Sequence, residues 1–313
     1  MATVRIGTRK SPLALAQAEW VAGLLRNRDM AVELIGIVTE GDRGLLRDKG
    51  MFVKALDEAL LAGRIDLAVH SAKDVPVEIA PGLIVAAVPA REDAGDLLVS
   101  RTGADLKALP AGGRVGTASL RRSAQLLYLR PDLEIVEIRG NVETRLGKIL
   151  GDPSVCDAVV VAAAGINRLG GAARVIESRG LKYARIPTAD FLPAPGQGAL
   201  MLVSRTADAP AFSELTDAPT ATALRAERAL VKALGADCRW PVAAWAQAGV
   251  GDADPAGGCA IEAAMYSVEG KFRVRAGLSG RDPEATAQEL AAHLLEKGGQ
   301  KILEWNRTHC ARA

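Results

Sequence analysis

Short apolar runs alternate with amphipathic helical segments through the first 90 residues, and this alternation constrains the fold more than any other feature of the chain. One helix is predicted to begin at Ser11 and Pro12, which suit an N-cap and a first helical position. A second helix is predicted over 51–62. Because strands that alternate with helices pair in parallel, we predict an α/β domain with a mostly parallel sheet. Its strands are expected at 4–8, 32–38, 65–69 and 83–88.

The same alternation restarts near Asp96 without repeating the sequence of the first part. The Pro- and Gly-rich segment LPAPGQG at 192–198 is typical of a crossing or hinge segment, and the apolar run 199–203 predicts one more strand. We therefore expect a second α/β domain of similar plan. Its strands are expected at 114–116, 133–138 and 157–162, and its helices at 120–129, 142–150 and 163–169.

The composition changes after about Pro210. Three apolar runs separated by turn-rich segments, together with helical segments on both sides, predict a small α+β domain in which a strand meander packs on helices. The runs lie at 241–246, 260–267 and 272–278, and the helices at 220–234, at 283–297 and up to about 305. The domain boundaries that we expect are 1–90 with about 199–213, then 95–190, then 218–313.

Composition excludes several classes of protein. Aromatic residues make up only 4% of the chain, which leaves little material for stacking on nucleic-acid bases. The net charge is only +2, so a strongly acidic ligand needs a local basic cluster. The chain has no apolar run of 18 residues, no signal-like N-terminus, no CxxC or zinc spacing and no Walker motif. We expect a cytoplasmic protein without a membrane segment, a metal site or a nucleic-acid partner.

The segment AVHSAKDVP at 68–76 is the strongest indication of a site. An apolar strand ends abruptly in polar residues, and Pro76 then stops regular structure. Ligands of open α/β sheets bind beyond the carboxyl ends of the strands. A lone carboxylate at that point, here Asp74, can stabilise a cation formed during a reaction. The alternative is a structural ion pair between Lys73 and Asp74.

Arginines gather in the turns that follow predicted strands, beside hydroxyl groups and helix N-termini. Such turns offer an anion several donors, and guanidinium binds carboxylate or phosphate through two parallel hydrogen bonds. Any one of these arginines alone is explained as well by a solvated surface charge or a surface ion pair. As a set they indicate a cleft between two domains that binds several carboxylates or phosphates. The side chains are Arg9, Ser11, Thr117, Ser119, Arg121, Arg122, Arg139, Arg145 and Arg168.

Cys238 follows the end of a predicted helix, in the loop GADCRWP. A lone cysteine is usually a buried apolar filler. A loop position beside Arg239 favours a more reactive thiol, whereas Asp237 disfavours the thiolate. The sequence leaves both interpretations open, and the other three cysteines have no comparable surroundings.

Taken together, these motifs resemble those of the porphobilinogen deaminase (hydroxymethylbilane synthase) family. The resemblance covers nearly the whole chain in family order and includes Cys238 and Pro241. The matching segments are RIGTRKSPLALAQ at 5–17, TEGD at 39–42, KGMFVKALDEALL at 49–61, AVHSAKDVPVE at 68–78, REDAGD at 91–96, VGTASLRRSAQL at 115–126, IRGNVETRLGKI at 138–149, AGINRLG at 164–170, LPAPGQGAL at 192–200 and TALRAERAL at 222–230.

The resemblance implies two α/β domains like those of type II periplasmic binding proteins around a cleft, plus a small α+β C-terminal domain. It implies a transferase that joins four porphobilinogens head to tail, with release of ammonia, to give hydroxymethylbilane in tetrapyrrole and haem biosynthesis. It also implies a dipyrromethane cofactor held by a thioether to the loop cysteine, here Cys238. Asp74 is then expected to stabilise the azafulvenium cation left by ammonia, while Lys49, Lys73 and the arginine set bind carboxylates. The family implies a monomer.

Two segments depart from the family pattern. The segment between Asp42 and Lys49 is shorter than the usual lid loop, and Asp237, Arg239 and Trp240 replace the usual small and amide residues beside the cysteine. A different class of function also fits the two-domain plan, namely a non-catalytic binding protein for a small polyanion. Such a binder needs neither the Lys73–Asp74 pair nor Cys238.

Overall fold

The computed structural model describes residues 3–37, 50–151, 154–235, 240–249 and 258–310. The chain divides into two compact units. The first comprises Met1–Glu92 and Ala199–Ala221, and the second comprises Asp93–Gly198 and Thr222–Ala313. This division keeps the C-terminal part of the chain with the middle part, and the expected boundaries of three domains stay a prediction.

The first unit is built on a five-stranded sheet with the order β2-β1-β3-β10-β4. Strand β1 pairs in parallel with β2 and β3, whereas β10 is antiparallel to both β3 and β4. Four strands therefore run in one direction, as the alternation predicts. The strands are β1 (Val4–Arg9), β2 (Val32–Ile37), β3 (Leu67–Ser71), β4 (Leu83–Ala87) and β10 (Leu200–Arg205).

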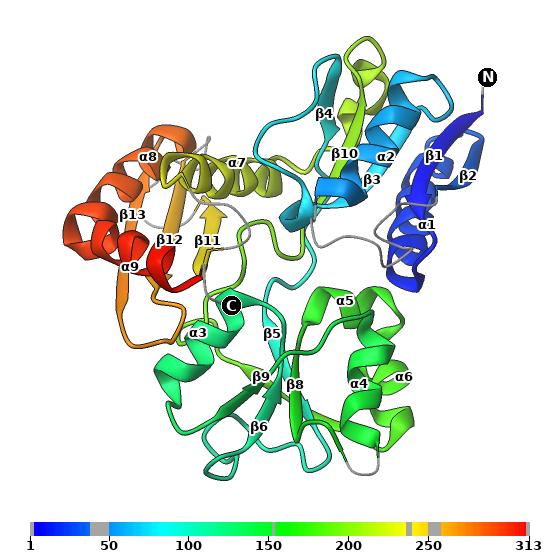
Figure 1. Ribbon diagram of the computed structural model, residues 1–313. Helices are drawn as coiled ribbons and strands as arrows, with labels where there is room; N and C mark the ends of the chain where they lie inside the picture. The colour runs from blue at the N-terminus through cyan, green and yellow to red at the C-terminus, as the bar shows by residue number, and fades with distance from the viewer. Residues whose placement is uncertain (1–2, 38–49, 152–153, 236–239, 250–257, 311–313) are drawn as a thin grey trace. The chain divides into compact units, whose positions relative to one another are not determined.

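Two helices cover this sheet. Helix α1 (Pro12–Arg26) begins at its N-cap Ser11, whose hydroxyl accepts from the Ala14 N–H, and has Pro12 in its first turn, as predicted. It lies beside β1 and β2 (Figure 1) and buries one face against them. Helix α2 (Gly50–Leu61) contributes Leu56 and Leu60 to a second cluster against β3 and β10. With apolar side chains on both faces, the sheet can expose function only at its edge.

The first sheet of the second unit has the order β7-β6-β8-β5-β9. Strand β6 pairs in parallel with β7 and β8, and β5 is antiparallel to β8 and β9. The plan is that of the first unit, with one antiparallel strand in the fourth place. The strands are β5 (Asp96–Ser100), β6 (Arg114–Gly116), β7 (Glu134–Val136), β8 (Ala158–Ala162) and β9 (Lys182–Ile186), and the main helices are α3 (Leu120–Leu129), α4 (Val142–Leu150), α5 (Ala163–Arg168) and α6 (Gly171–Val175).

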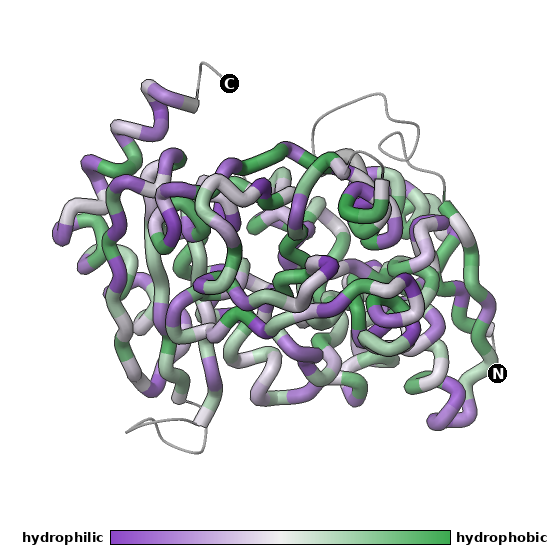
Figure 2. The backbone as a smooth tube through the Cα atoms, turned by 90° about the horizontal axis from the view of Figure 1, so that it is seen from below, coloured by the Kyte–Doolittle hydropathy of each residue, from purple (hydrophilic) through white to green (hydrophobic). Residues whose placement is uncertain are grey.

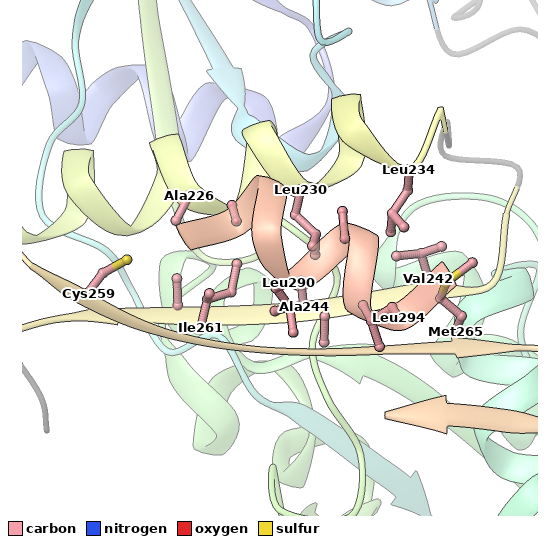
Figure 3. Packing of buried hydrophobic residues seen from close by; sticks show 14 of the residues in the cluster. Ala226, Leu230, Leu234, Val242, Ala244, Cys259, Ile261, Met265, Leu290 and Leu294 are labelled. Carbon is pink, nitrogen blue, oxygen red and sulfur yellow. The ribbon is translucent and has the colours of Figure 1, made fainter. Parts of the chain in front are cut away.

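The second unit also holds a three-stranded antiparallel meander, β11-β12-β13. Helices α7 and α8 pack leucines against this sheet, as Figure 3 shows for Leu230, Leu290 and Leu294. The predicted break between the last two helices is present: α8 is followed by a π-helical turn over Leu295–Gly299, in which Gly298 has a φ of 116°. The elements are α7 (Ala218–Ala233), β11 (Val242–Ala248), β12 (Cys259–Tyr266), β13 (Arg273–Gly280), α8 (Pro283–Leu294) and α9 (Gln300–Cys310).

The expected fold class is confirmed as two α/β sheets of one plan and a small α+β part. The likeness to type II periplasmic binding proteins stays what the family resemblance implies. Hydrophobic and hydrophilic stretches alternate along the chain instead of forming one long hydrophobic segment (Figure 2). Among the described residues, no helix is long and apolar enough to cross a membrane.

Candidate functional site

Asp74 lies in a short turn at the carboxyl end of β3. The strand is buried through His70, and one turn of 3-10 helix follows over Ala72–Asp74. The Ala72 N–H donates to the Ala199 carbonyl at 3.0 Å, and the Val75 N–H closes the turn onto the Ala72 carbonyl at 3.2 Å. Ala72 and Val75 are buried, and Lys73 and Asp74 between them are half-buried. Buried residues on both sides therefore hold the two charged side chains at the end of the strand.

The turn between β1 and α1 lies at the same edge of the sheet, because β1 and β3 are parallel neighbours. It carries Arg9, half-buried at the last position of β1, and Ser11, the N-cap of α1. The buried Gln17 of α1 donates to the Ser71 hydroxyl at 2.9 Å. This hydrogen bond ties α1 to the end of β3, so the structure brings Arg9, Ser11, Lys73 and Asp74 to one edge of the first unit.

His70 precedes this turn and was not predicted as a site residue. Its side chain is buried, and within the described part of the chain its Nε2 has no hydrogen-bond partner. Burial lowers the pKa of His70 to about 4, although the attraction of Asp74 opposes the change. The imidazole is therefore neutral at pH 7 and adds no positive charge beside the Asp74 carboxylate.

Arg121 and Arg122 occupy the first turn of α3 in the second unit. The N-cap of this helix is Ser119, whose hydroxyl accepts from the Arg122 N–H at 3.5 Å. The buried Thr117 accepts from the Ser119 N–H at 3.1 Å. The sequence predicts that these arginines lie in a turn that an anion can reach. In the structure both residues are buried and only 5% exposed. The explanations as solvated charges or surface ion pairs therefore do not apply to them, and their role as ligand-binding groups stays a prediction.

The partner that holds these arginines is Asp96, the first residue of β5. Arg121 Nη2 and Arg122 Nη2 each donate to a different carboxylate oxygen of Asp96 at 2.7 Å. Burial alone raises the pKa of Asp96, but the two guanidinium groups outweigh it and hold the pKa well below its usual range. The buried Gln197 of the LPAPGQG segment donates to the same carboxylate at 3.0 Å.

Sequence reasoning missed Asp96 and Gln197 as partners of the arginines. The available signal was a carboxylate at the head of the apolar run DLLVS, within the motif REDAGD. An ionisable group that begins a buried strand requires a buried partner of opposite charge. The signal does not identify that partner, because Arg121 lies 25 residues further along the chain.

Three further predicted arginines lie on other turns of the second unit. Arg139 is exposed and pairs with Glu137 at 2.6 Å. Arg145 Nε donates to the Gly140 carbonyl at 2.8 Å, and Arg168 Nη2 donates to the Gly198 carbonyl at 2.8 Å. The roles of these three arginines as ligand-binding groups stay a prediction.

Gly140 permits the turn that carries Arg139 and Arg145. Its φ is 111°, and a Cβ at this position would lie 2.8 Å from Thr144 Cγ2. Any other residue there would displace the start of α4, whose N-cap Asn141 accepts from the Thr144 N–H at 2.8 Å. The glycine of the IRGN motif is therefore a requirement of the backbone.

Lys49 and Cys238 lie outside the described residues, as do the short segment that precedes Lys49 and the neighbours Asp237 and Arg239. The predictions for all of these remain as made. Trp240, which follows the cysteine loop, is half-buried against the core of the three-stranded sheet. Its carbonyl accepts from the Val242 N–H at 2.8 Å, which starts β11 next to the loop.

Each unit thus places cationic and hydroxyl donors at turns that follow parallel strands, and the first adds a half-buried carboxylate. These features define an α/β protein with charged and hydroxyl side chains at its strand ends. The family model "Porphobilinogen deaminase, dipyromethane cofactor binding domain" matches residues 4–213. The chain belongs to the porphobilinogen deaminase family.

Porphobilinogen deaminases of other organisms are similar in sequence to nearly the whole of this chain. Porphobilinogen deaminase of Desulforudis audaxviator is 45% identical over 96% of this chain and 96% of its own length. That of Rubrobacter xylanophilus is 45% identical over 96% of this chain and 97% of its own. Among solved structures, the periplasmic aliphatic sulphonate binding protein SsuA from Escherichia coli is similar over 74% of this chain and 70% of its own, at 14% identity and a TM-score of 0.38.

The protein is therefore a transferase of tetrapyrrole biosynthesis that condenses porphobilinogen to hydroxymethylbilane with release of ammonia, and its cofactor is dipyrromethane. The alternative interpretation, a non-catalytic binder of a small polyanion, is not favoured by full-length identity to deaminases.

Proposed function

We propose that Asp74 is the catalytic carboxylate of this reaction. The observation that carries this assignment is the turn that fixes Asp74 at the carboxyl end of β3, between the buried Ala72 and Val75. When ammonia leaves porphobilinogen, a cation remains on the pyrrole. A preorganised carboxylate lowers the barrier because it interacts more strongly with that developing charge than with the substrate.

The cationic and hydroxyl side chains around the strand ends bind the carboxylates of the substrate and of the growing product. Each porphobilinogen brings an acetate and a propionate, so negative charge accumulates with each condensation. A protein of net charge +2 meets this charge with local donors. In the first unit these are Arg9, Ser11, Lys49 and Lys73; in the second they are Thr117, Ser119, Arg121, Arg122, Arg139, Arg145 and Arg168.

The same donor set fits dipyrromethane, whose two pyrrole rings carry the same carboxylates. The Nε atoms of Arg121 and Arg122 are buried without a hydrogen-bond acceptor among the described residues. This state is costly, and a nearby carboxylate relieves it. When bound, dipyrromethane supplies the pyrrole carbon to which the first porphobilinogen is joined. We assign its covalent attachment to Cys238, through a thioether.

The intact mass of the denatured protein tests this attachment. We expect the wild type to carry an adduct equal to two porphobilinogen units less their ammonia, and Cys238→Ser to lack it. The matched control is Cys259→Ala, since Cys259 is buried at the start of β12. An adduct retained by Cys238→Ser, or lost in the control, would contradict the assignment.

We also place the reaction in the cytoplasm and propose that a monomer performs it without nucleic acid. The described cysteines Cys156 and Cys259 are free thiols, which accords with a reducing compartment. Light scattering of the purified protein tests the oligomeric state, and a dimer that persists on dilution would overturn this part of the proposal.

A further inference from the structure

Asp96 forms the centre of a buried cluster of charges in the second unit. One carboxylate oxygen accepts from Arg121 Nη2, and the other accepts from Arg122 Nη2 and from Gln197 Nε2. The second edge of each guanidinium is also held, because Arg121 Nη1 donates to the Leu192 carbonyl at 2.6 Å and Arg122 Nη1 to the Val160 carbonyl at 2.9 Å. Contacts on both terminal nitrogens fix the plane of each guanidinium.

The cluster carries a fixed net charge. Two guanidinium groups share one carboxylate, which leaves one positive charge in excess, and the N-terminus of α3 adds a partial positive charge at the same place. Asp96 itself is only 1% exposed and stays ionised, because both cations stabilise its charged form. A buried excess of positive charge is unfavourable without an anion.

Two N–H groups in the cluster have no acceptor among the residues that the structure describes. The Nε atoms of both arginines are buried and unbonded. Together with the excess positive charge, they indicate that an anion completes the cluster when ligand binds. Asp96 sets where that anion can bind, because it fixes the distance between the two cations.

We propose that Asp96 is a positioning residue that acts through Arg121 and Arg122 and orients both guanidinium groups toward one carboxylate of the tetrapyrrole ligand. This inference rests on the proposed function of the two arginines. Without the Asp96 charge, two guanidinium groups on adjacent residues repel each other and separate. The ligand carboxylate then loses the paired geometry that makes guanidinium recognition strong.

Gln197 supports the same carboxylate without carrying charge. Its amide also donates to the Ala94 carbonyl at 2.7 Å, so it connects Asp96 to the backbone that leads into β5. Removing this amide loosens the carboxylate but keeps both ion pairs. Gln197→Met therefore provides a milder variant than Asp96→Asn, with similar side-chain length and no introduced charge.

The experiment compares steady-state kinetics of the holoenzyme, measured as ammonia release at several porphobilinogen concentrations. In Asp96→Asn we expect KM to rise about tenfold or more while kcat stays within about threefold, because binding geometry is lost and Asp74 is untouched. In Gln197→Met we expect a smaller rise of KM, about threefold. The matched control is Asp157→Asn, which breaks a more exposed aspartate–arginine pair with Arg114 and should leave KM unchanged.

A merely structural role predicts lower melting temperature with unchanged KM for the folded, cofactor-loaded fraction, and that result in Asp96→Asn would overturn the proposal. If Asp96→Asn does not fold, Gln197→Met tests the proposal in its place. An unchanged KM in Gln197→Met would then overturn the positioning role of Asp96. Arg121→Lys and Arg122→Lys distinguish the binding role of the arginines from the positioning role of Asp96. If neither raises KM, the proposed role of the arginines fails; if they raise KM and Asp96→Asn does not, only the positioning role fails.

Discussion

The strand-end turns of the first unit and the arginine cluster of the second unit use charge in opposite ways. In the first unit, Lys73 and Asp74 are half-buried on a turn that buried neighbours hold in place. In the second, Arg121, Arg122 and Asp96 lie inside the protein and neutralise one another in part. Both regions occur on sheets of the same plan.

This difference in burial fits the two separate roles that we propose for these charges, stabilising a cation and binding carboxylates. A carboxylate that must respond to a cation forming during the reaction is most effective where substrate can reach it, on a rigid turn. Groups that bind charges already present in the substrate gain from being fixed in advance, even at a cost in desolvation. Substitution of Asp74 should therefore reduce turnover without unfolding the protein, whereas substitutions in the buried cluster of Asp96, Arg121 and Arg122 should affect folding and binding together.

The largest effect on activity is expected for Asp74→Asn. We expect kcat to fall by about 10³-fold or more, because an uncharged amide of the same shape cannot stabilise the substrate cation. The melting temperature should change little, since the side chain is half-buried on a turn. Ammonia release measures the first quantity and thermal denaturation the second. The control Glu58→Gln removes an exposed carboxylate of α2 and should retain wild-type turnover.

The largest effect on stability is expected for Asp96→Asn. Removing the carboxylate that pairs with two buried guanidinium groups should cost about 3–5 kcal/mol of the free energy of unfolding, measured by urea denaturation. Asp74→Asn should cost less than about 1 kcal/mol. Similar losses in the two variants would remove the distinction between the regions.

An intermediate effect is expected from pH, within the first unit. His70 has a folded pKa of about 4, below the unfolded value of 6.5, so the unfolded state binds a proton first as pH falls. His70 should therefore remove about 3 kcal/mol of stability as pH decreases from 7 to below 4. In His70→Asn this loss should be absent. Urea denaturation at pH 7, 5.5 and 4.5 measures it, and parallel curves for both proteins would contradict the prediction.

Asp57 of α2 should act with the opposite sign in the same pH range. Burial raises its pKa to about 6, with a further contribution from Glu58, so the folded state binds a proton before the unfolded state does. Its contribution therefore stabilises the fold as pH falls from about 7 to 4. Asp57→Asn should be more stable than wild type at pH 7 and equal to it near pH 4. A variant less stable than wild type at pH 7 would refute this sign.

The smallest effect on stability is expected for Arg139→Gln. Its ion pair with Glu137 is exposed, so the free energy of unfolding should change by less than about 1 kcal/mol. The proposed binding role nevertheless predicts a higher KM for porphobilinogen. A variant with lower stability and unchanged KM would place Arg139 with the structural arginines instead.

Local sequence signals predicted most of the fold. The N-cap and proline at the start of α1, the apolar runs of β1 and β3, and the turn at Asp74 are all consequences of neighbouring residues. Strand β9 was not predicted, because its alternating charged and apolar residues resemble an exposed segment until β5 pairs with it. The break between the last two helices was predicted next to Gly298, which has a positive φ in the structure.

The site was predicted less completely than the fold. Motifs located the arginines, but their burial depends on pairing across long sequence separations, as between Arg122 and Asp96 or Gln17 and Ser71. The order of residue types along the chain does not show which buried charged residues form ion pairs with one another. The roles of Lys49 and Cys238 remain predictions for the experiments above.

The position of β10 in the first sheet has a consequence for synthesis on the ribosome. Strand β4 joins the sheet through β10, yet β4 ends at Ala87 and β10 begins at Leu200. The five-stranded sheet of the second unit draws its strands from Asp96–Ile186. The ribosome therefore synthesises every strand of this second sheet before β10, which completes the sheet of the first unit. Until then, the edges of β3 and β4 that pair with β10 stay unpaired. We expect the N-terminal region to be the part of the growing chain that depends most on chaperones. Limited proteolysis of stalled nascent chains measures whether this region folds later than the second sheet.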